Sequence, residues 1–407
     1  MLLCFIIAYK IVVDKVLTLC YHKDIMSEVI KMIKAVKIRL FPTKEQEVLM
    51  FKSCGVARFT YNWGLNRWNE IYKSGEKPNK IKVRTEFNNT LKKDDNYKWL
   101  KEVSGQVTAK SFDDLKDGFD RFFKGLSGYP KFKTKKKSKK SFYVRYDSIK
   151  FKDHKVNFEK IGKVKYNTNY KIPNLSKYNN PRCHFDGKYW YLTLGFEHNE
   201  NQVGLNKDLS IGIDLGVKDF AVVNCLDKPI KNINKSVKIR KLKKRLKRLQ
   251  RQVSRKYLMN KQNNKFIKTN NIIKLEHEIR LIYRKLNNIR NNHIHQTTNK
   301  IIKLKPHRVV MEDLNIQGMM KNKHLSKAIQ EQCFYEFIRQ MKYKCEWNNI
   351  KFIQVDRFYP SSKTCSCCGN VKKDLKLSDR VYKCDKCGLV IDRDYNASIN
   401  LSNYKIA

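Results

Sequence analysis

Residues 209–223 read LSIGIDLGVKDFAVV, an apolar segment in which two glycines flank a single aspartate. Because side chains alternate along a strand, Gly212, Asp214 and Gly216 share one face, and the other face is apolar, with Ile211, Ile213, Leu215 and Val217. A carboxylate between two bare backbone positions has room for a metal ion and a phosphate beside it. A solvent-facing Asp214 is the alternative, but an exposed edge does not require paired glycines. We therefore predict a strand, a turn and a second strand, with Asp214 as a functional residue.

A second carboxylate follows in HRVVMEDLNI, residues 307–316. The apolar run Val309–Met311 predicts a buried strand, and Glu312 and Asp313 stand at its C-terminal end. Open α/β sheets place their functional residues at that end. Acidic residues at strand ends are common, so Glu312 indicates a site only in combination with Asp214.

The segment between these two strands predicts a basic helical hairpin over residues 237–305. Apolar residues recur at spacings of three and four, first at Ile239, Leu242, Leu246, Leu249 and Val253, then at Leu275, Ile279, Ile282, Leu286 and Ile289. Two such helices pack along this seam and leave one face of Lys and Arg, which suits the backbone of a nucleic-acid duplex. A merely soluble hairpin would usually mix Glu with Lys on its surface, and the first helix contains no acidic residue.

Cysteine spacing near the C-terminus predicts a metal site. Cys365 and Cys368 form one C-x-x-C pair and Cys384 and Cys387 another, with 15 residues between the pairs. Two such knuckles supply four thiolates to one tetrahedral Zn²⁺, as in a zinc ribbon. Disulfides are the alternative, but we find no secretory signal and the other cysteines are scattered. Cys367 lies inside the first knuckle with poorer spacing. A site closed by four thiolates has no open position, so we expect a structural zinc.

Two further aspartates, Asp392 and Asp394, stand where a helix begins in DRDYNASINL. A helix N-terminus favours carboxylates. With Asp214 and Glu312, one of them makes three acids at the ends of strands or helices. Three such carboxylates are typical of a nuclease that binds two Mg²⁺ or Mn²⁺ ions about 4 Å apart.

The net charge of the chain indicates its partner. There are 87 Lys and Arg residues against 38 Asp and Glu, a formal charge of +49 over 407 residues. Such an excess is typical of proteins that neutralise many phosphates, so we expect a nucleic acid. We find no uninterrupted apolar run of about 18 residues, which argues against a membrane span. With 41% hydrophobic residues, the chain can form two or three domains with cores of their own.

Patterned sequence begins at Met32. Residues 1–31 lack the basic segment and cleavage site of a signal peptide, so we interpret them as an accessory or spurious extension. Alternating residues after Met32 predict a strand over 32–43, and Thr43 and Gln46 have the spacing of a capping box at the start of a helical region, 44–125. The aromatic residues of that region are candidates for stacking on bases, although core packing is the more common role at helical spacing: Phe51, Phe59, Tyr61, Trp63 and Trp68.

Residues 126–205 predict short alternating strands. In RCHFDGKYWYLTLGF, residues 182–196, Asp186 and Gly187 separate two apolar runs as a two-residue hairpin turn would. The basic run KFKTKKKSKK, residues 131–140, predicts a mobile loop, and its charge also suits a phosphate clamp.

Several motifs together resemble one family. MIKAVKIRLFPTKEQ, ARFTYNWGLNRW, GIDLGVKDFAV, VVMEDLNI, DRFYPSSKTCSCCG and DRDYNASINL, in this order, resemble TnpB (OrfB), the transposon-encoded RNA-guided nucleases related to type V CRISPR effectors. The resemblance covers residues 32–405. It implies a multidomain protein of α+β and α/β type, with a wedge-like β-barrel over 32–43 and 126–205 and a helical recognition insert over 44–125. A RuvC-type RNase H fold would occupy 206–363 and 389–407, interrupted by a zinc ribbon at 364–388.

The resemblance also assigns roles. The three catalytic acids of the family fall on Asp214, Glu312 and Asp394, and Asp392 is the second choice for the third position. The partners would be a guide RNA from the transposon end and double-stranded target DNA beside a short flanking motif, in the cytoplasm or nucleoid of a prokaryote. The sequence leaves open the oligomeric state and two other functions: a transposase that performs strand transfer itself, and a guide-dependent DNA-binding regulator that does not cut.

Overall fold

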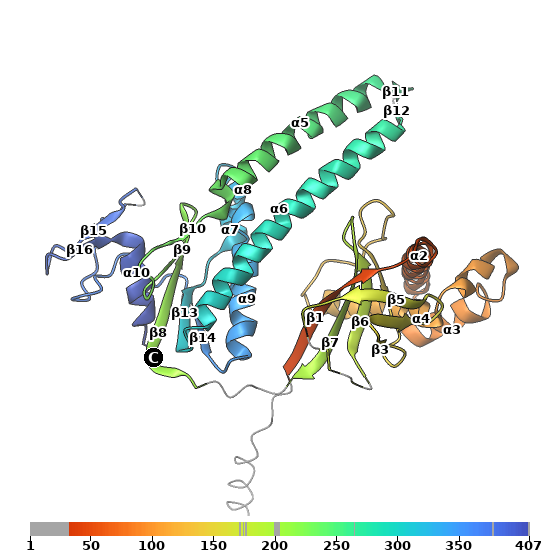
Figure 1. Ribbon diagram of the computed structural model, residues 1–407, viewed down its shortest axis with the longest axis horizontal. Helices are drawn as coiled ribbons and strands as arrows, with labels where there is room; N and C mark the ends of the chain where they lie inside the picture. Colours follow the sequence, from red (N-terminus) through yellow and green to blue (C-terminus); the bar gives the residue numbers. More distant parts are fainter. Residues whose placement is uncertain are drawn as a thin grey trace, which may run out of the picture.

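The computed structural model describes residues 32–405, apart from 171, 174, 176, 199–203, 264 and 377. The predicted extension, residues 1–31, lies outside the described residues. Figure 1 shows two lobes, one built on a seven-stranded sheet and the other on a five-stranded sheet, with the long helices α5 and α6 rising between them as a hairpin.

The first lobe is built on an antiparallel sheet with strand order β2-β6-β7-β1-β5-β4-β3. Its strands are β1 (Met32–Phe41), β2 (Lys140–Tyr143), β3 (Phe151–Lys152), β4 (Lys155–Phe158), β5 (Gly162–Asn167), β6 (Asn179–Phe185) and β7 (Trp190–His198). The two edge strands, β2 and β3, do not pair with each other in the described part of the chain. The expected barrel is therefore an open sheet.

Helices fill the predicted insert between β1 and β2. They are α2 (Lys44–Lys73), α3 (Lys80–Asn89), a 3₁₀ helix (Asp95–Glu102) and α4 (Gly105–Phe123). The capping box at the start of α2 is confirmed. The Gln46 N–H donates to Thr43 Oγ1 at 3.3 Å, and the Thr43 N–H donates to Gln46 Oε1 at 3.0 Å. The Gln46 amide also donates to the Lys163 carbonyl at 3.0 Å, which joins the helix to β5.

The five aromatic residues of the insert that were candidates for stacking on bases lie in the core or pack against it. Trp68 stacks on Phe119 with ring centroids 4.7 Å apart, and Trp63 meets Phe87 edge to face at 5.0 Å. Tyr61 is buried. Core packing, the alternative that helical spacing favours, is thus the arrangement found.

The hairpin between β6 and β7 forms as expected, but its turn lies one residue further along. The Asp186 N–H donates to the Tyr189 carbonyl at 3.1 Å, so Asp186 is the last paired residue and Gly187 and Lys188 form the turn. Gly187 has φ +98°, a conformation that favours glycine at the first turn position. Asp186 is therefore not a turn residue itself, but its carboxylate accepts hydrogen bonds from the N–H groups of Lys188 and Tyr189 and so stabilises the turn.

The basic run 131–140 is anchored at its beginning. The Asn62 side chain forms two hydrogen bonds with the Lys133 backbone, at 2.8 and 2.9 Å, and the Lys133 ammonium lies 3.6 Å from the Tyr61 ring centroid. The prediction of a mobile loop therefore does not hold for this end of the run, because α2 fixes it.

The second lobe is built on a mixed sheet with strand order β10-β9-β8-β13-β14. Its strands are β8 (Asn206–Leu215), β9 (Asp219–Val223), β10 (Ile230–Lys231), β13 (Pro306–Glu312) and β14 (Lys351–Val355). Strand β9 runs antiparallel to both β8 and β10, whereas β13 runs parallel to both β8 and β14. The strand–turn–strand prediction around Asp214 is therefore confirmed.

Helices cover both faces of this sheet. On one face, α6 (Asn270–Ile302), α8 (Ser326–Gln332) and α9 (Phe334–Glu346) pack on strand residues such as Ile213 and Met311. On the other face, Leu401 of α10 (Arg393–Ser402) packs on Val310. A short helix, α7 (Ile316–Lys321), follows β13, and strands β15 (Val381–Lys383) and β16 (Val390–Asp392) precede α10. Within the described residues, we find no helix with the length and apolar character needed to span a bilayer.

The basic helical hairpin is confirmed. Helix α5 (Val237–Met259) packs against α6 along the predicted seam, with Ile239, Leu246, Leu249, Ile282 and Leu286 buried. Two short strands, β11 (Lys261–Gln262) and β12 (Lys265–Phe266), close the tip of the hairpin (Figure 1).

The β6–β7 hairpin of the first lobe contacts helix α6 of the second lobe. Arg284 of α6 forms an ion pair with Asp186 at 2.7 Å and donates to Tyr191 Oη at 3.1 Å. Both charged side chains are largely buried, at 19% and 18% exposure. The acid predicted as a turn residue thus joins the hairpin helix to the first lobe.

Candidate functional site

Helix α10 lies directly on strand β8 because β8 has a glycine at the crossing point. A Cβ added to Gly212 would lie 1.9 Å from the Ser398 carbonyl oxygen and 2.5 Å from the Ser402 nitrogen. The sequence interpretation gave this glycine the role of leaving room for a metal ion and a phosphate. The structure corrects that reason, since helix α10 occupies the space beside Gly212. The close approach carries Asp394, in the first turn of α10, toward Asp214 on the same strand.

Three acids from separate elements line one cavity of about 270 Å³: Asp214 from β8, Glu312 from β13 and Asp394 from α10. In the parallel β8–β13 pair, Ile213 lies opposite Met311, so the next positions along the strands are Asp214 and Glu312. Neighbouring strands are about 4.8 Å apart. The three residues selected from the sequence are therefore brought together by the fold.

The electrostatics of this cavity favour a cation. Burial of the Asp214 carboxyl, together with the nearby charges of Glu312 and Asp394, raises its pKa to about 8, while Arg393 opposes them. Carboxylates that resist ionisation beside one another are stabilised by a divalent cation, and carboxylate oxygen is the donor that Mg²⁺ and Mn²⁺ prefer. The donor set thus fits hard divalent ions.

Side chains of the protein hold two of these acids. Arg393 donates to Asp394 Oδ1 at 2.8 and 3.1 Å, and Arg380 lies 3.7 Å from Asp394 Oδ2. The buried Ser361 hydroxyl donates to Glu312 Oε1. The three acids line the cavity together with Lys and Arg side chains.

Asp392 has a different position from Asp394. It is the N-cap of α10, and its carboxylate accepts from the N–H groups of Asp394 and Tyr395, both at 3.0 Å. Asp392 is exposed and does not line the cavity, whereas Asp394 does. The geometry thus separates the two candidates for the third acid.

The four predicted cysteines form a cluster that can hold a metal ion. The ligand atoms of Cys365, Cys368, Cys384 and Cys387 all lie within 4.8 Å of one another. The Cys365–Cys387 and Cys368–Cys384 sulfurs are 3.5 and 3.6 Å apart, close to the sulfur separation of about 3.8 Å that four 2.3 Å Zn–S bonds give in a tetrahedron. The donor set fits zinc. Cys367 is exposed and lies outside the cluster.

The cysteine segment is hydrogen-bonded to the helix that carries Asp394. Asn396 donates to the Thr364 carbonyl at 2.7 Å and accepts from the Ser366 N–H at 3.0 Å, while Asn400 donates to the Thr364 carbonyl at 2.6 Å. The sequence analysis missed both asparagines. Their spacing of four residues in a predicted helix was the available signal, because it places them on one face. The second strand of this segment, β16, runs to Asp392, beyond the predicted boundary at 388.

Comparison with known proteins identifies the family. The sequence matches the OrfB family described as "Probable transposase" over residues 195–323, its "Helix-turn-helix domain" over 32–77, and a "Cas12f1-like, TNB domain" over 334–401. The resemblance to the TnpB (OrfB) family is confirmed, because two models of that family match this chain. In this TnpB-like chain, the segment matched as helix-turn-helix consists of strand β1 and the single long helix α2, with the residues that follow it.

Two relatives of this TnpB-like chain match over most of its length. A "Putative RNA-guided DNA endonuclease" of Streptomyces pristinaespiralis is 27% identical over 371 residues, which cover 90% of this chain and 88% of the relative. The "Putative RNA-guided DNA endonuclease InsQ" of Escherichia coli K12 is 26% identical, with 91% and 92% covered. The Cas12f1 protein in a solved complex with sgRNA and target DNA shares the fold, with a TM-score of 0.51 at 15% identity, covering 92% of this chain and 99% of that one.

Proposed function

We propose that this protein is an RNA-guided DNA endonuclease of a transposable element. It cuts double-stranded DNA that pairs with a guide RNA from the transposon end, beside a short flanking motif. The observation that carries the proposal is the convergence of Asp214, Glu312 and Asp394 on one cavity. The names of the Streptomyces and Escherichia relatives support the same activity. The mixed five-stranded sheet, with acids on β8, β13 and α10, supports a RuvC-type RNase H fold.

The three acids are the residues that hold Mg²⁺ or Mn²⁺. When bound, two such ions supply an activated water and neutralise charge on the leaving oxygen. Basic side chains at the same cavity bind the phosphodiester and orient it toward the acids: Lys218, Lys363, Lys376, Arg380 and Arg393. Arg393 and Arg380 also form ion pairs with Asp394, which hold this carboxylate at the cavity.

Zinc in the four-cysteine cluster has a structural role in this proposal. Four thiolates leave no open coordination position, so the metal does not touch substrate. The cluster fixes the two knuckles, and Asn396 and Asn400 hold the first knuckle against α10. A closed cluster therefore supports the helix that presents Asp394.

The large positive charge supplies the nucleic-acid affinity. Helix α5 carries Lys and Arg along its length and no acidic residue, and its apolar residues are used in the seam with α6. The remaining basic face fits the phosphate backbone of a guide–target hybrid. The protein therefore separates its two tasks: basic surfaces bind, and the acidic cavity cuts.

Four single substitutions test this function. Asp214→Ala, Glu312→Ala and Asp394→Ala each remove a cavity carboxylate, so each abolishes Mg²⁺-dependent cleavage while guide and target binding stay near the parent value. Asp392→Ala is the matched control, because it removes only a helix cap worth about 1 kcal/mol. Sequencing the copurified RNA identifies the guide that the assay needs.

The same assay distinguishes the alternatives. A strand-transfer transposase joins element ends to target DNA in place of releasing cut target, and a DNA-binding regulator binds target but leaves it intact in the parent protein. If Asp392→Ala is inactive and Asp394→Ala cuts, the third acid is wrongly assigned. If all four variants cut as the parent does, the cavity is not the nuclease site.

A further inference from the structure

A buried glutamine holds the turn that follows Asp214. Gln332, the last residue of α8, is 3% exposed, and its Nε2 lies 3.2 Å from the carbonyl oxygens of both Gly216 and Val217. Gly216 and Val217 line the same cavity as the three acids. One amide group thus donates to two successive carbonyls in the wall of the candidate nuclease site.

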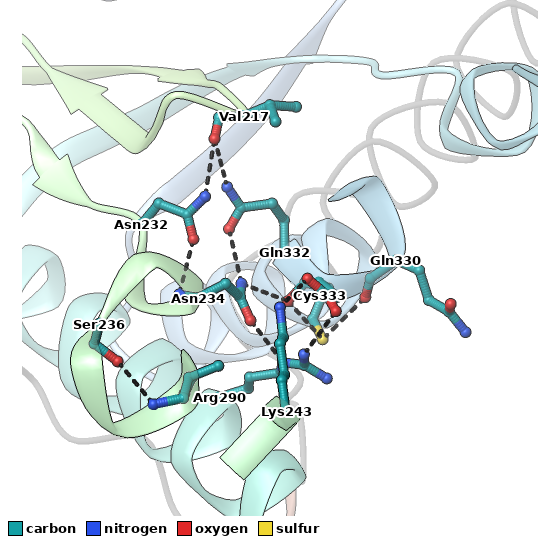
Figure 2. Close-up of polar contacts among 11 residues, drawn as sticks. Val217, Asn232, Asn234, Ser236, Lys243, Arg290, Gln330, Gln332 and Cys333 are labelled. Carbon is teal, nitrogen blue, oxygen red and sulfur yellow. Dashed lines mark hydrogen bonds and ion pairs between the residues drawn. The ribbon is translucent and has the colours of Figure 1, made fainter. Parts of the chain in front are cut away.

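A second side-chain amide donates to the same turn. Asn232 Nδ2 donates to the Val217 carbonyl at 2.9 Å, and Figure 2 shows Asn232 and Gln332 converging on that oxygen. Within the turn itself, the Gly216 N–H donates to the Phe220 carbonyl at 3.3 Å. Side chains from distant parts of the chain therefore supply much of the hydrogen bonding that fixes this turn.

The glutamine is connected in turn to the basic hairpin (Figure 2). Asn234, just before α5, donates to the Glu331 carbonyl at 2.9 Å and lies 3.5 Å from Gln332 Oε1. Arg290 of α6 donates to Asn234 Oδ1 at 2.8 Å, and the Glu331 carboxylate forms ion pairs with Lys243 of α5 and with Arg290. Continuous polar contacts thus run from both hairpin helices to the turn after Asp214.

We propose that Gln332 is a positioning residue of the nuclease site. It does not line the cavity with the acids and does not touch substrate. It fixes the backbone two and three residues after Asp214 and thereby the direction of the Asp214 carboxylate. This inference rests on the proposed nuclease function for its catalytic consequence, but its structural part is independent of that function.

The physical reason is the cost of removing hydrogen-bond donors from two part-buried acceptors. Without Gln332 the Gly216 carbonyl loses its side-chain donor, and the Val217 carbonyl keeps only the bond from Asn232. A carbonyl without a donor is unfavourable, so a turn that loses both Gln332 bonds rotates its peptides toward other donors. A two-metal site requires carboxylates held to within about 0.5 Å. Rotation at Gly216 and Val217 therefore weakens metal binding at Asp214 before it affects the fold.

The test replaces glutamine by a side chain of similar shape that has no N–H donors. Gln332→Met removes both bonds, and Gln340→Met is the matched control. Gln340 is a fully buried glutamine on α9 that bonds to the side chains of Thr298 and Glu336 and not to the turn. Three quantities are measured for both variants and the parent: amide hydrogen exchange of residues 215–220, the thermal stabilisation by Mn²⁺, and the Mg²⁺ concentration that gives half-maximal cleavage.

In Gln332→Met, we expect exchange in 215–220 and the half-maximal Mg²⁺ concentration each to rise about tenfold, with less stabilisation by Mn²⁺ and unchanged target binding. Gln340→Met lowers the melting temperature without moving the exchange or metal measurements. If residues 215–220 exchange in Gln332→Met as they do in the parent, the inference is overturned. It is also overturned if these residues exchange faster but metal binding is unchanged. A parent protein that binds Mn²⁺ but cuts no DNA contradicts the proposed function and leaves the positioning role supported by the first two measurements.

Discussion

Replacing Gly212 by alanine should separate helix α10 from the sheet. The new Cβ would lie 1.9 Å from the Ser398 carbonyl oxygen, whereas an ordinary contact of this kind is about 3.4 Å. The difference, about 1.5 Å, is the distance by which strand and helix must move apart at this point. The neighbouring contact with the Ser402 nitrogen, at 2.5 Å, also involves backbone, so no side-chain rotation relieves it.

Two consequences follow from a shift of this size. Overpacking usually costs 1 to 3 kcal/mol, and a backbone clash without a flexible partner belongs at the upper end, about 3 kcal/mol. Asp394 moves with α10, away from Asp214 and Glu312. Because misplacement by about 1 Å can cost a factor of about 100 in rate, we expect cleavage to fall by at least that factor in molecules that remain folded.

Thermal unfolding and single-turnover cleavage, measured below the melting temperature, test both numbers. Gly55→Ala is the matched control, since Gly55 lies in helix α2 and an added Cβ there meets nothing within 4 Å. We expect that control to gain up to about 1 kcal/mol from higher helix propensity and to keep full activity. If Gly212→Ala melts and cuts as the parent does, the close packing of α10 on β8 does not determine the site geometry, and our explanation of Gly212 is wrong.

Two further predictions concern the zinc cluster and the net charge. Cys384→Ser removes one of four thiolates, so zinc in the purified protein should fall below about one ion per chain and cleavage should fall with it. Cys367→Ser, outside the cluster, should leave zinc content and cleavage unchanged. Metal analysis of both variants is the test, and full zinc retention in Cys384→Ser would argue against the site. The formal charge of +49 predicts that affinity for target DNA falls by about 1,000-fold between 50 and 200 mM salt, because phosphates that bind Lys and Arg release their counterions. Binding titrations at several salt concentrations measure this slope, and an affinity that does not change with salt would contradict the prediction.

Features set by short-range patterns were predictable from the sequence. The Thr43–Gln46 capping box depends on residues three apart, and the hairpin seam depends on apolar spacing within each helix, so both are local. The cysteine pairs are also local, and two such pairs specify one tetrahedral cluster. The three acids were found because each stands at the end of a strongly patterned element. The resemblance to a known family chose Asp394 over Asp392, and the capping role of Asp392 agrees with that choice.

Features set by contacts between distant segments were not predictable. The role of Gly212 depends on the path of a helix almost two hundred residues away, and no pattern near Gly212 reports it. Gln332 occurs in an unremarkable polar helix, and only the fold brings it to Gly216 and Val217. Whether the first sheet closes into a barrel likewise depends on whether its edge strands, β2 and β3, pair with each other. A sequence pattern predicts a strand but does not specify its partner.

The packing at Gly212 changes how the motif GIDLG should be used when other genomes are searched. The glycine serves the contact between strand and helix, and the aspartate serves the chemistry of the proposed nuclease, so under that proposal selection acts on them for different reasons. A descendant that keeps the fold as a DNA-binding protein loses the pressure to retain Asp214 but not the pressure to retain Gly212. Inheritance of the glycine therefore marks ancestry and architecture, and an annotation of nuclease activity should depend on the three acids alone.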